Sequence, residues 1–320
     1  MKKPFSNLSE ATITVAMDLA LAAARGREGV TAPNPPVGCA LLDKRGEVLA
    51  VAGHQGAGQP HAEASAIAQA SAAGVSHRIH TVVVTLEPCN HHGRTPPCTD
   101  AILATSARAV VIGMKDPNPA VQGGGMARLA AAGLSVRLYR DGRDAALRRL
   151  LAPFTKRVTQ GLPWVTVKQA LNAAGSMIPP TRQKTFTSQS SLVLAHQLRR
   201  RADAILTGSG TVLADDPLFT VRLVEDFPGK RRKLVLFDRR GRIPMQYGQA
   251  ARARGLDVVM ATSLEQALRD VAAAGCLEVL VEAGPQFTAH VLQSPFWDEH
   301  VRITQQEGGD RLEILTREKT

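Results

Sequence analysis

The chain has 320 residues, 44% of them hydrophobic, which is enough for two domains with buried cores. Its net charge of +11 is spread evenly: residues 1–150 hold 16 Lys and Arg against 11 Asp and Glu, and the remainder 23 against 17. With only 4% aromatic residues for stacking on bases, this pattern argues against a nucleic-acid-binding protein.

Segment composition also argues against export and membrane insertion. No apolar run reaches the roughly 18 residues that would span a membrane. Two lysines near the start are not followed by the apolar stretch of a secretory signal. Cys39 and Cys276 stand in apolar surroundings and do not suggest a disulfide framework. We therefore expect a cytoplasmic protein that makes no membrane contact.

The first half of the chain, residues 1–150, predicts one α/β domain. A helix is expected over residues 9–25, with Ser9 as its N-cap. After it we expect strands over 39–42 and 47–52, a helix over 61–73, a strand over 81–86, a helix over 99–106, a strand over 109–113, a helix over 125–133 and a strand over 134–139. This order predicts a mixed sheet with helices on both faces.

The second half, residues 151–320, alternates in the same way. A basic helical connection over 140–162 leads to Pro163, which opens a strand. We expect strands over 163–168, 204–207, 233–237 and 278–282 and a helix over 188–201. The alternation predicts a parallel-rich α/β domain with ligands at the carboxyl ends of its strands. We interpret the basic runs 199–201 and 230–233 as a solvated helix face and a loop.

Two short strings, HAE at 61–63 and EPCNHHGRTPPC at 87–98, contain the strongest chemical signal. His61, Cys89 and Cys98 supply three zinc ligands and leave a fourth position open, as in catalytic zinc sites. Zinc in such a site makes a water molecule reactive at neutral pH. Glu63 matches the proton-carrying glutamate of the zinc deaminases, whose pattern is H-x-E followed by P-C. A structural zinc site, or unrelated buried cysteines, is the alternative.

Eight residues separate Cys89 from Cys98, whereas cytidine-type deaminases usually have two. With this insert the chain resembles the riboflavin-biosynthesis bifunctional deaminase/reductase family, whose two activities are diaminohydroxyphosphoribosylaminopyrimidine deaminase and 5-amino-6-(5-phosphoribosylamino)uracil reductase. The resemblance extends through PNPPVGC at 33–39, His54, and DPNP at 116–119. It implies a cytidine-deaminase-like zinc domain followed by a dihydrofolate-reductase-like α/β domain.

The resemblance also implies a substrate for the zinc site. It is 2,5-diamino-6-ribosylamino-4(3H)-pyrimidinone 5′-phosphate, which hydrolytic deamination converts to 5-amino-6-ribosylaminouracil 5′-phosphate. Asn34 and His54 would contact the pyrimidine, while His91, Arg94 and Asn118 would face the ribose phosphate. We expect a homo-oligomer, a dimer or a tetramer, as the assembly.

The family's reductase half uses NADPH to open the ribosylamine to a ribitylamine, and this chain matches it best over residues 208–222. The resemblance assigns a ligand-binding frame to Lys168, Thr211, Asp215, Arg222 and Glu282. Three features depart from the family: Ala174 replaces an aspartate, Leu192 and Val193 replace two phosphate-binding arginines, and a C-terminal stretch has no counterpart.

These departures lead us to expect an impaired reductase half and little NADPH oxidation. The deaminated product would then enter riboflavin synthesis through a separate reductase, or a related pathway such as that of a 7-azapteridine. One alternative is a fully bifunctional enzyme, which would consume NADPH with the deaminated substrate. Another is a deaminase that edits nucleic acid, which would bind RNA tightly and in a salt-sensitive way.

Overall fold

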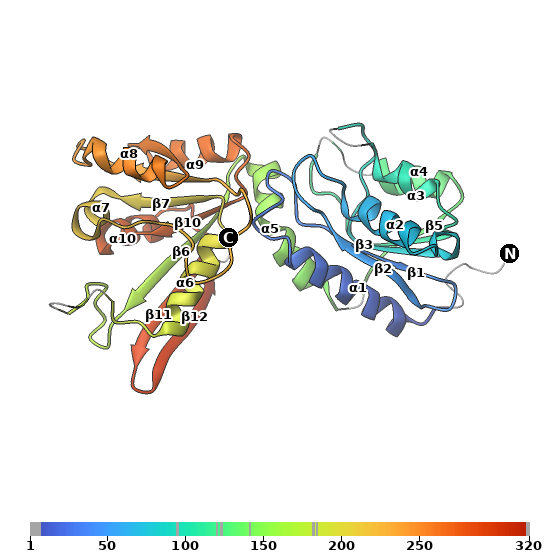
Figure 1. Cartoon of the computed structure of the whole chain (residues 1–320), viewed down its shortest axis with the longest axis horizontal. Coiled ribbons are helices and arrows are strands. Elements are labelled where there is room, and N and C mark those ends of the chain that lie inside the picture. Colours follow the sequence, from blue (N-terminus) through green and yellow to red (C-terminus); the bar gives the residue numbers. More distant parts are fainter. Residues whose placement is uncertain are drawn as a thin grey trace. The chain divides into compact units, whose positions relative to one another are not determined.

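A computed structural model describes residues 8–93, 96–119, 121, 124–140, 142–180, 183 and 185–317 of the chain. It divides into two compact units, Met1–Thr159 and Gln160–Thr320. Each unit is a sheet covered by helices (Figure 1). Within the described residues, every helix is too short or too polar to cross a membrane.

The first unit contains a five-stranded sheet in the order β2-β1-β3-β4-β5. Its strands are β1 (Gly38–Leu42), β2 (Val48–Gly53), β3 (Thr81–Leu86), β4 (Ala109–Met114) and β5 (Ser135–Leu138). Strand β1 runs antiparallel to both of its neighbours, whereas β3, β4 and β5 are parallel. The mixed sheet expected from the sequence is confirmed.

Helices cover both faces of this sheet (Figure 1). They are α1 (Glu10–Arg25), α2 (Ala62–Ala72), η1 (Ser76–Arg78), α3 (Cys98–Leu103), α4 (Gly124–Ala131) and α5 (Asp144–Gln160). Successive side chains of a strand point to opposite faces, so Ala40 and Leu42 pack with α1 and α5 whereas Cys39 and Leu41 pack with α2. At Gly38 a Cβ would lie 1.9 Å from the Ala20 carbonyl oxygen, so the absence of a side chain lets α1 approach β1 closely.

The second unit contains a seven-stranded sheet in the order β12-β11-β6-β10-β7-β8-β9. Its strands are β6 (Trp164–Leu171), β7 (Ala204–Gly208), β8 (Arg232–Phe237), β9 (Leu256–Ala261), β10 (Glu278–Glu282), β11 (Glu299–Gln306) and β12 (Gly309–Thr316). All neighbours are parallel except β11 and β12. The parallel-rich sheet is confirmed, and it includes three strands that the sequence pattern does not predict, β9, β11 and β12.

The helices of the second unit are α6 (Gln189–Arg201), α7 (Ser209–Asp215), α8 (Met245–Ala253), α9 (Leu264–Ala273) and α10 (Pro285–Gln293). Strand β7 shows how they are divided between the two faces. Ala204 and Leu206 pack with α9 and α10, whereas Ile205 packs with α7 and α8. Leu198 of α6 packs against β10 and β11. The carboxyl ends of the parallel strands therefore meet at one edge, where ligands usually bind.

Candidate active site

Three separate segments of the first unit bring the expected metal ligands together. His61 is the N-cap of α2, Cys89 follows β3, and Cys98 is the first residue of α3. The ligand atoms of the three side chains all lie within 4.8 Å of one another. Nδ1 of His61 lies 3.6 Å from Sγ of Cys89 and 3.3 Å from Sγ of Cys98.

These distances fit a zinc ion. With Zn–S near 2.3 Å and Zn–N near 2.05 Å, tetrahedral geometry places sulfur and nitrogen ligands about 3.6 Å apart. One imidazole and two sulfurs are also the donor set of catalytic zinc sites with an open fourth position. His61, Cys89 and Cys98 therefore form a zinc site.

The electrostatics of the two sulfurs favour a cation. Hydrogen bonds from Cys98 and from His61 lower the pKa of the Cys89 thiol to about 4, so this group is a thiolate. The backbone N–H of Cys98 also donates to Sγ of Cys89, over 3.3 Å. In turn, the bond to Cys89 and burial raise the pKa of Cys98. A divalent ion at this site would hold both sulfurs as thiolates.

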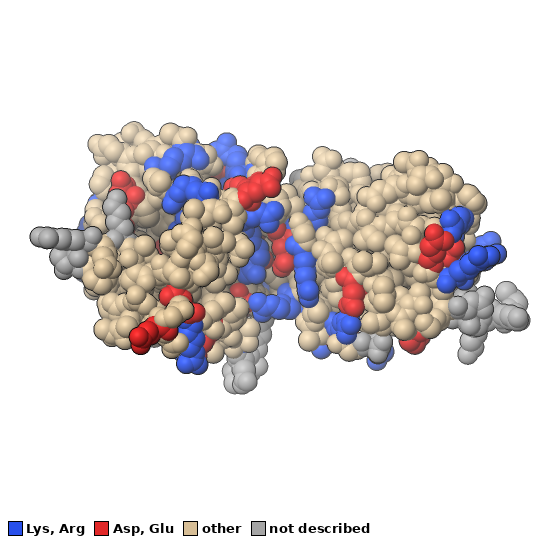
Figure 2. Space-filling view, turned by 60° about the horizontal axis from the view of Figure 1, so that its bottom comes forward, with Lys and Arg blue, Asp and Glu red and all other residues tan. Residues whose placement is uncertain are grey.

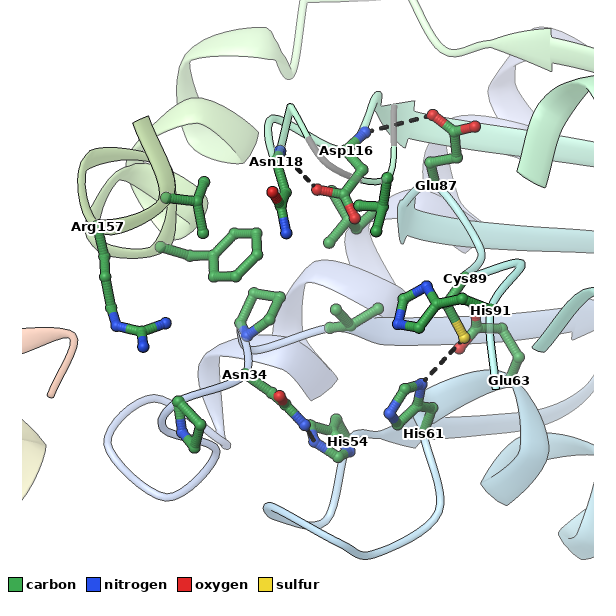
Figure 3. Close-up of a pocket in the computed structure, with 17 residues that line it drawn as sticks. Asn34, His54, His61, Glu63, Glu87, Cys89, His91, Asp116, Asn118 and Arg157 are labelled. Atoms are coloured by element: carbon green, nitrogen blue, oxygen red, sulfur yellow. Dashed lines mark hydrogen bonds between the residues drawn. The ribbon is translucent and has the colours of Figure 1, made fainter. Parts of the chain in front are cut away.

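Glu63 lies in the first turn of α2 and faces the same site. Its side chain is buried, with 3% of the residue exposed. Burial raises the pKa of this carboxyl group, with the negative charge of Cys89 as a further cause. A raised pKa makes a carboxyl group a stronger base, which suits a group that accepts and returns a proton beside a zinc site. Figure 3 shows the Glu63 side chain beside Cys89.

Asn34 and His54, the predicted pyrimidine contacts, touch each other. Nδ2 of Asn34 donates to Nε2 of His54 over 3.1 Å, while Nδ1 of His54 lies 3.2 Å from the Pro60 carbonyl oxygen. In the tautomer that satisfies both contacts, Nδ1–H donates to Pro60 and Nε2 accepts from Asn34. Burial lowers the pKa of His54, so its ring is neutral. The rings of His54 and His61 meet edge to face, 4.8 Å between centroids.

A buried carboxylate that the zinc motif does not predict as a site residue supports the loop of Asn118. Glu87 accepts hydrogen bonds from the backbone N–H of Asp116 at 3.3 Å and from that of Met126 at 3.0 Å. Oδ1 of Asp116 then accepts from the backbone N–H of Asn118. Glu87 thus connects the end of β3 to the loop after β4 and to the start of α4. Glu87 could have been predicted as a site residue from its position directly before Pro88 and Cys89.

Most of the residues described above line one cavity of about 290 Å³, which is near the lower limit for small-molecule sites. Its wall includes the predicted residues Asn34, His54, His61, Glu63, Cys89, His91 and Asn118. It also includes Phe154, Arg157 and Val158 of α5 (Figure 3). The sequence places these three in a basic helical connection and does not mark them as site residues. Arg94 lies outside the described residues.

The second unit contains a buried ion cluster at the end of β10. Glu282 is 4% exposed, and its carboxylate accepts from Nε of Arg199 at 2.5 Å and from Nη2 at 3.2 Å. Nζ of Lys168 lies 3.3 Å from the same carboxylate. Although burial opposes ionisation, Arg199 and Lys168 lower the pKa of Glu282, which is therefore charged. The resemblance predicts Lys168 and Glu282 as ligand-binding residues, whereas Arg199 emerges only from the structure.

Thr211, Asp215 and Arg222 of the predicted frame occupy different places. Oγ1 of Thr211 accepts from the backbone N–H of Gly284 over 2.7 Å, so it connects α7 to the start of α10. Asp215 is exposed in the last turn of α7. The backbone N–H of Arg222 donates to Nδ1 of His196, which ties this segment to α6.

Comparison with known proteins identifies the family. Residues 11–114 match the family model of the cytidine and deoxycytidylate deaminase zinc-binding region, and residues 163–305 match the RibD C-terminal domain. The riboflavin biosynthesis protein RibD of Aquifex aeolicus is 34% identical over 309 residues, which cover 89% of this chain and 84% of that protein. This chain belongs to the RibD family.

Other RibD proteins extend the comparison. The riboflavin biosynthesis protein RibD of Escherichia coli is 43% identical over 204 residues, 63% of this chain and 54% of that protein. A solved structure of RibD from Acinetobacter baumannii has a TM-score of 0.80 at 28% identity, covering 92% of this chain and 87% of that one. A Thermotoga maritima structure, of a diaminohydroxyphosphoribosylaminopyrimidine deaminase/5-amino-6-(5-phosphoribosylamino)uracil reductase, has a TM-score of 0.80 at 30% identity, covering 93% and 88%.

Membership in the RibD family favours the bifunctional alternative over the impaired reductase that we expected. The reductase domain is present, since the match to the RibD C-terminal domain runs from residue 163 to 305. The turn at Ala174, where the resemblance implies an aspartate, is held by Asn172, whose Oδ1 accepts from the backbone N–H of Ala174 and of Ser176. The Lys168–Arg199–Glu282 cluster is likewise assembled, although Leu192 and Val193 stand where the resemblance implies arginines.

The interpretation of the two basic runs as solvated is wrong for most of their residues. Acidic partners form ion pairs with four residues that are not exposed: Arg199, Arg201, Lys230 and Arg232. Arg231 pairs with Asp257 but remains exposed. Lys230 and Arg232 are deeply buried, with side chains 8% and 5% exposed. Figure 2 shows basic side chains interspersed with acidic ones. Apart from Asp226, which is six residues before Arg232, these partners lie in distant segments, so a local sequence window does not reveal them.

Proposed function

We propose that this protein is a bifunctional enzyme of riboflavin biosynthesis with a zinc-dependent deaminase and an NADPH-dependent reductase. The first unit would deaminate 2,5-diamino-6-ribosylamino-4(3H)-pyrimidinone 5′-phosphate, and the second would reduce the ribosylamine of the product to a ribitylamine. The observation that carries the deaminase half is the buried Glu63 beside the zinc site, on the wall of a cavity that also contains Asn34 and His54. The relatives' names support the choice of substrate.

In the deaminase half, His61, Cys89 and Cys98 would hold zinc, which supplies an activated water molecule when bound. Glu63 would take one proton from the attacking water and deliver it to the ring nitrogen. It would then carry the second proton, from the new hydroxyl group, to the amino group, which leaves as ammonia, so that one carboxyl group acts as base and as acid. Burial supports this role, because it raises the pKa of the Glu63 carboxyl group and so favours its protonated form.

His54 and Asn34 would orient the pyrimidine. Because Nδ1–H of His54 is engaged by the Pro60 carbonyl, the ring cannot rotate without losing that bond. Asn34 uses one amide N–H on His54, and its carbonyl oxygen and second N–H are the groups that would meet the pyrimidine edge. A neutral His54 and a carboxamide suit an uncharged heterocycle.

In the reductase half, NADPH would supply the hydride. The turns that follow β7 and β10 lie at the carboxyl ends of parallel strands, and each leads into a helix, α7 or α10. Such turns are typical sites for a nucleotide cofactor. Lys168 and Arg199 hold a charged Glu282 at the same edge, where it would orient the polar groups of the substrate.

Product analysis with the phosphorylated diaminopyrimidine, with and without NADPH, tests both halves. We expect release of ammonia in either case, and the ribitylamino product together with oxidation of NADPH only when NADPH is present. Ammonia without NADPH oxidation would favour a deaminase with an impaired reductase. Absence of ammonia from a zinc-loaded sample would refute the deaminase itself.

A further inference from the structure

The cavity of the first unit has an uneven charge along its length. Three carboxyl groups line it, those of Glu63, Glu87 and Asp116. Two thiolates cancel the charge of a bound zinc ion, so the carboxyl groups make the zinc end unfavourable for an anion. Among the described residues of the cavity wall, Arg157 is the single lysine or arginine.

Arg157 stands far from the zinc ligands within this cavity. It belongs to the last turn of α5, between Phe154 and Val158, which also line the wall. Figure 3 shows Arg157 at one end of the lining residues and Cys89 with Glu63 at the other, with Asn34, His54 and Asn118 between them. Phe154, three residues earlier on the same helix, is 8% exposed, and Arg157 itself is half-buried.

We infer that Arg157 is a specificity-determining residue of the deaminase and contacts the 5′-phosphate of its substrate. This inference rests on the proposed function and specifies how the substrate lies in the cavity. The pyrimidine must approach Glu63, so the phosphate extends away from the carboxyl groups and toward the guanidinium. Arginine suits this task because its planar fork donates two parallel hydrogen bonds to phosphate oxygens.

The position of Arg157 also suggests a second, purely structural role. A basic side chain in the last turn interacts favourably with the helix dipole, so Arg157 could simply stabilise α5. That role would alter thermal stability and affect all substrates equally. Discrimination between phosphorylated and unphosphorylated substrates therefore separates the two roles.

The decisive experiment compares the full-length, zinc-loaded protein with Arg157→Gln, Arg157→Lys and the control Arg148→Gln. Arg148 is an exposed arginine of the same helix and does not line the cavity. Steady-state deamination is measured with the 5′-phosphorylated substrate and with its dephosphorylated form. We expect Arg157→Gln to raise KM for the phosphorylated substrate about ten- to a hundredfold and to leave the dephosphorylated one unchanged. Lysine should restore part of the loss, and Arg148→Gln should match the unmodified protein.

Equal changes on both substrates, or a lower Tm with unchanged discrimination, would overturn the inference. A second measurement separates it from the proposed function, namely calorimetric binding of ribose 5-phosphate to the unmodified protein and to Arg157→Gln. Binding by the second unit is common to both proteins and cancels in the comparison. Weaker binding by the variant supports the phosphate contact even if neither protein deaminates, whereas identical binding refutes it.

Discussion

Nδ2 of Asn34 lies 3.1 Å from Nε2 of His54, and this contact joins the loop before β1 to the loop after β2. His54 is held from its other side by the Pro60 carbonyl, one residue before the zinc ligand His61. The two predicted pyrimidine contacts are therefore parts of one hydrogen-bonded chain that ends beside the metal site. A change at either residue should alter substrate orientation before it alters metal binding.

Replacing His54 tests that hydrogen-bonded chain. His54→Ala should retain zinc and reduce kcat/KM for deamination by about ten- to a hundredfold, because the pyrimidine loses an orienting contact and Asn34 loses its acceptor. Zinc content and turnover are measured on the same sample. A matched control is His77→Ala, which removes an exposed histidine of η1 that does not line the cavity. Loss of zinc from His54→Ala would mean that the chain supports the metal site instead.

Glu63→Gln should leave zinc bound and lower kcat by at least about a hundredfold, since the side chain keeps its shape but cannot carry a proton. The measurement is turnover per bound zinc. Glu47→Gln is a suitable control, because Glu47 is an exposed surface residue paired with Arg78. Retention of more than a few per cent of activity in Glu63→Gln would exclude it as the proton carrier.

Glu282→Gln should abolish most NADPH oxidation and lower the Tm of the second unit while deamination continues. Removing one partner from a buried ion pair is strongly destabilising, by about 3–5 kcal/mol, because Arg199 then remains buried without its counter-charge. Glu265→Gln breaks an exposed pair with Arg269 and should change stability by about 0.5 kcal/mol or less. Equal effects of the two substitutions on Tm would contradict the buried cluster.

A pH effect is expected from His196, whose pKa burial lowers to about 4, with Arg199 and Arg222 as further causes. The folded pKa lies below the unfolded value of about 6.5. The contribution to stability is therefore complete above pH 6.5 and is lost as the pH falls toward 4, because the unfolded chain binds the proton more readily. Protonation of Nδ1 would also break the hydrogen bond that it accepts from the backbone N–H of Arg222. His196→Gln should lose less stability between pH 7 and 5, measured by thermal unfolding of the second unit.

Arg94→Ala is predicted to weaken binding of the phosphorylated substrate far more than that of its dephosphorylated form, by about ten- to a hundredfold in KM. This prediction follows from the place of Arg94 in the insert between Cys89 and Cys98. Combined with Arg157→Gln it distinguishes two contacts from one. If one arginine alone meets the phosphate, the double variant should be no worse than the more affected single variant, whereas two independent contacts should give losses that add.

Residue identity and order were sufficient to predict the zinc triad and the alternation of strands and helices. Zinc accepts few ligand types and a fixed number of them, so His61, Cys89 and Cys98 are recognisable without any knowledge of their positions in space. The buried strands are visible for a similar reason, because runs such as 81–86 are apolar or nearly so and end at a clear break. The polar, partly exposed strands β11 and β12 have no such pattern, and the sequence does not predict them.

The sequence does not indicate which charged residues belong to the sites, because this depends on how distant segments pack together. Arg199 and Arg157 look like solvated positions in their own helices, since an amphipathic helix has basic residues on its outer face. Arg199 becomes part of a buried cluster because Glu282, 83 positions later, ends the strand beside it. Arg157 lines the cavity because the packing of α5 against the sheet brings its last turn to a site built from earlier segments. Residues so far apart in the sequence come into contact only when the chain folds, so no local sequence pattern predicts the contact.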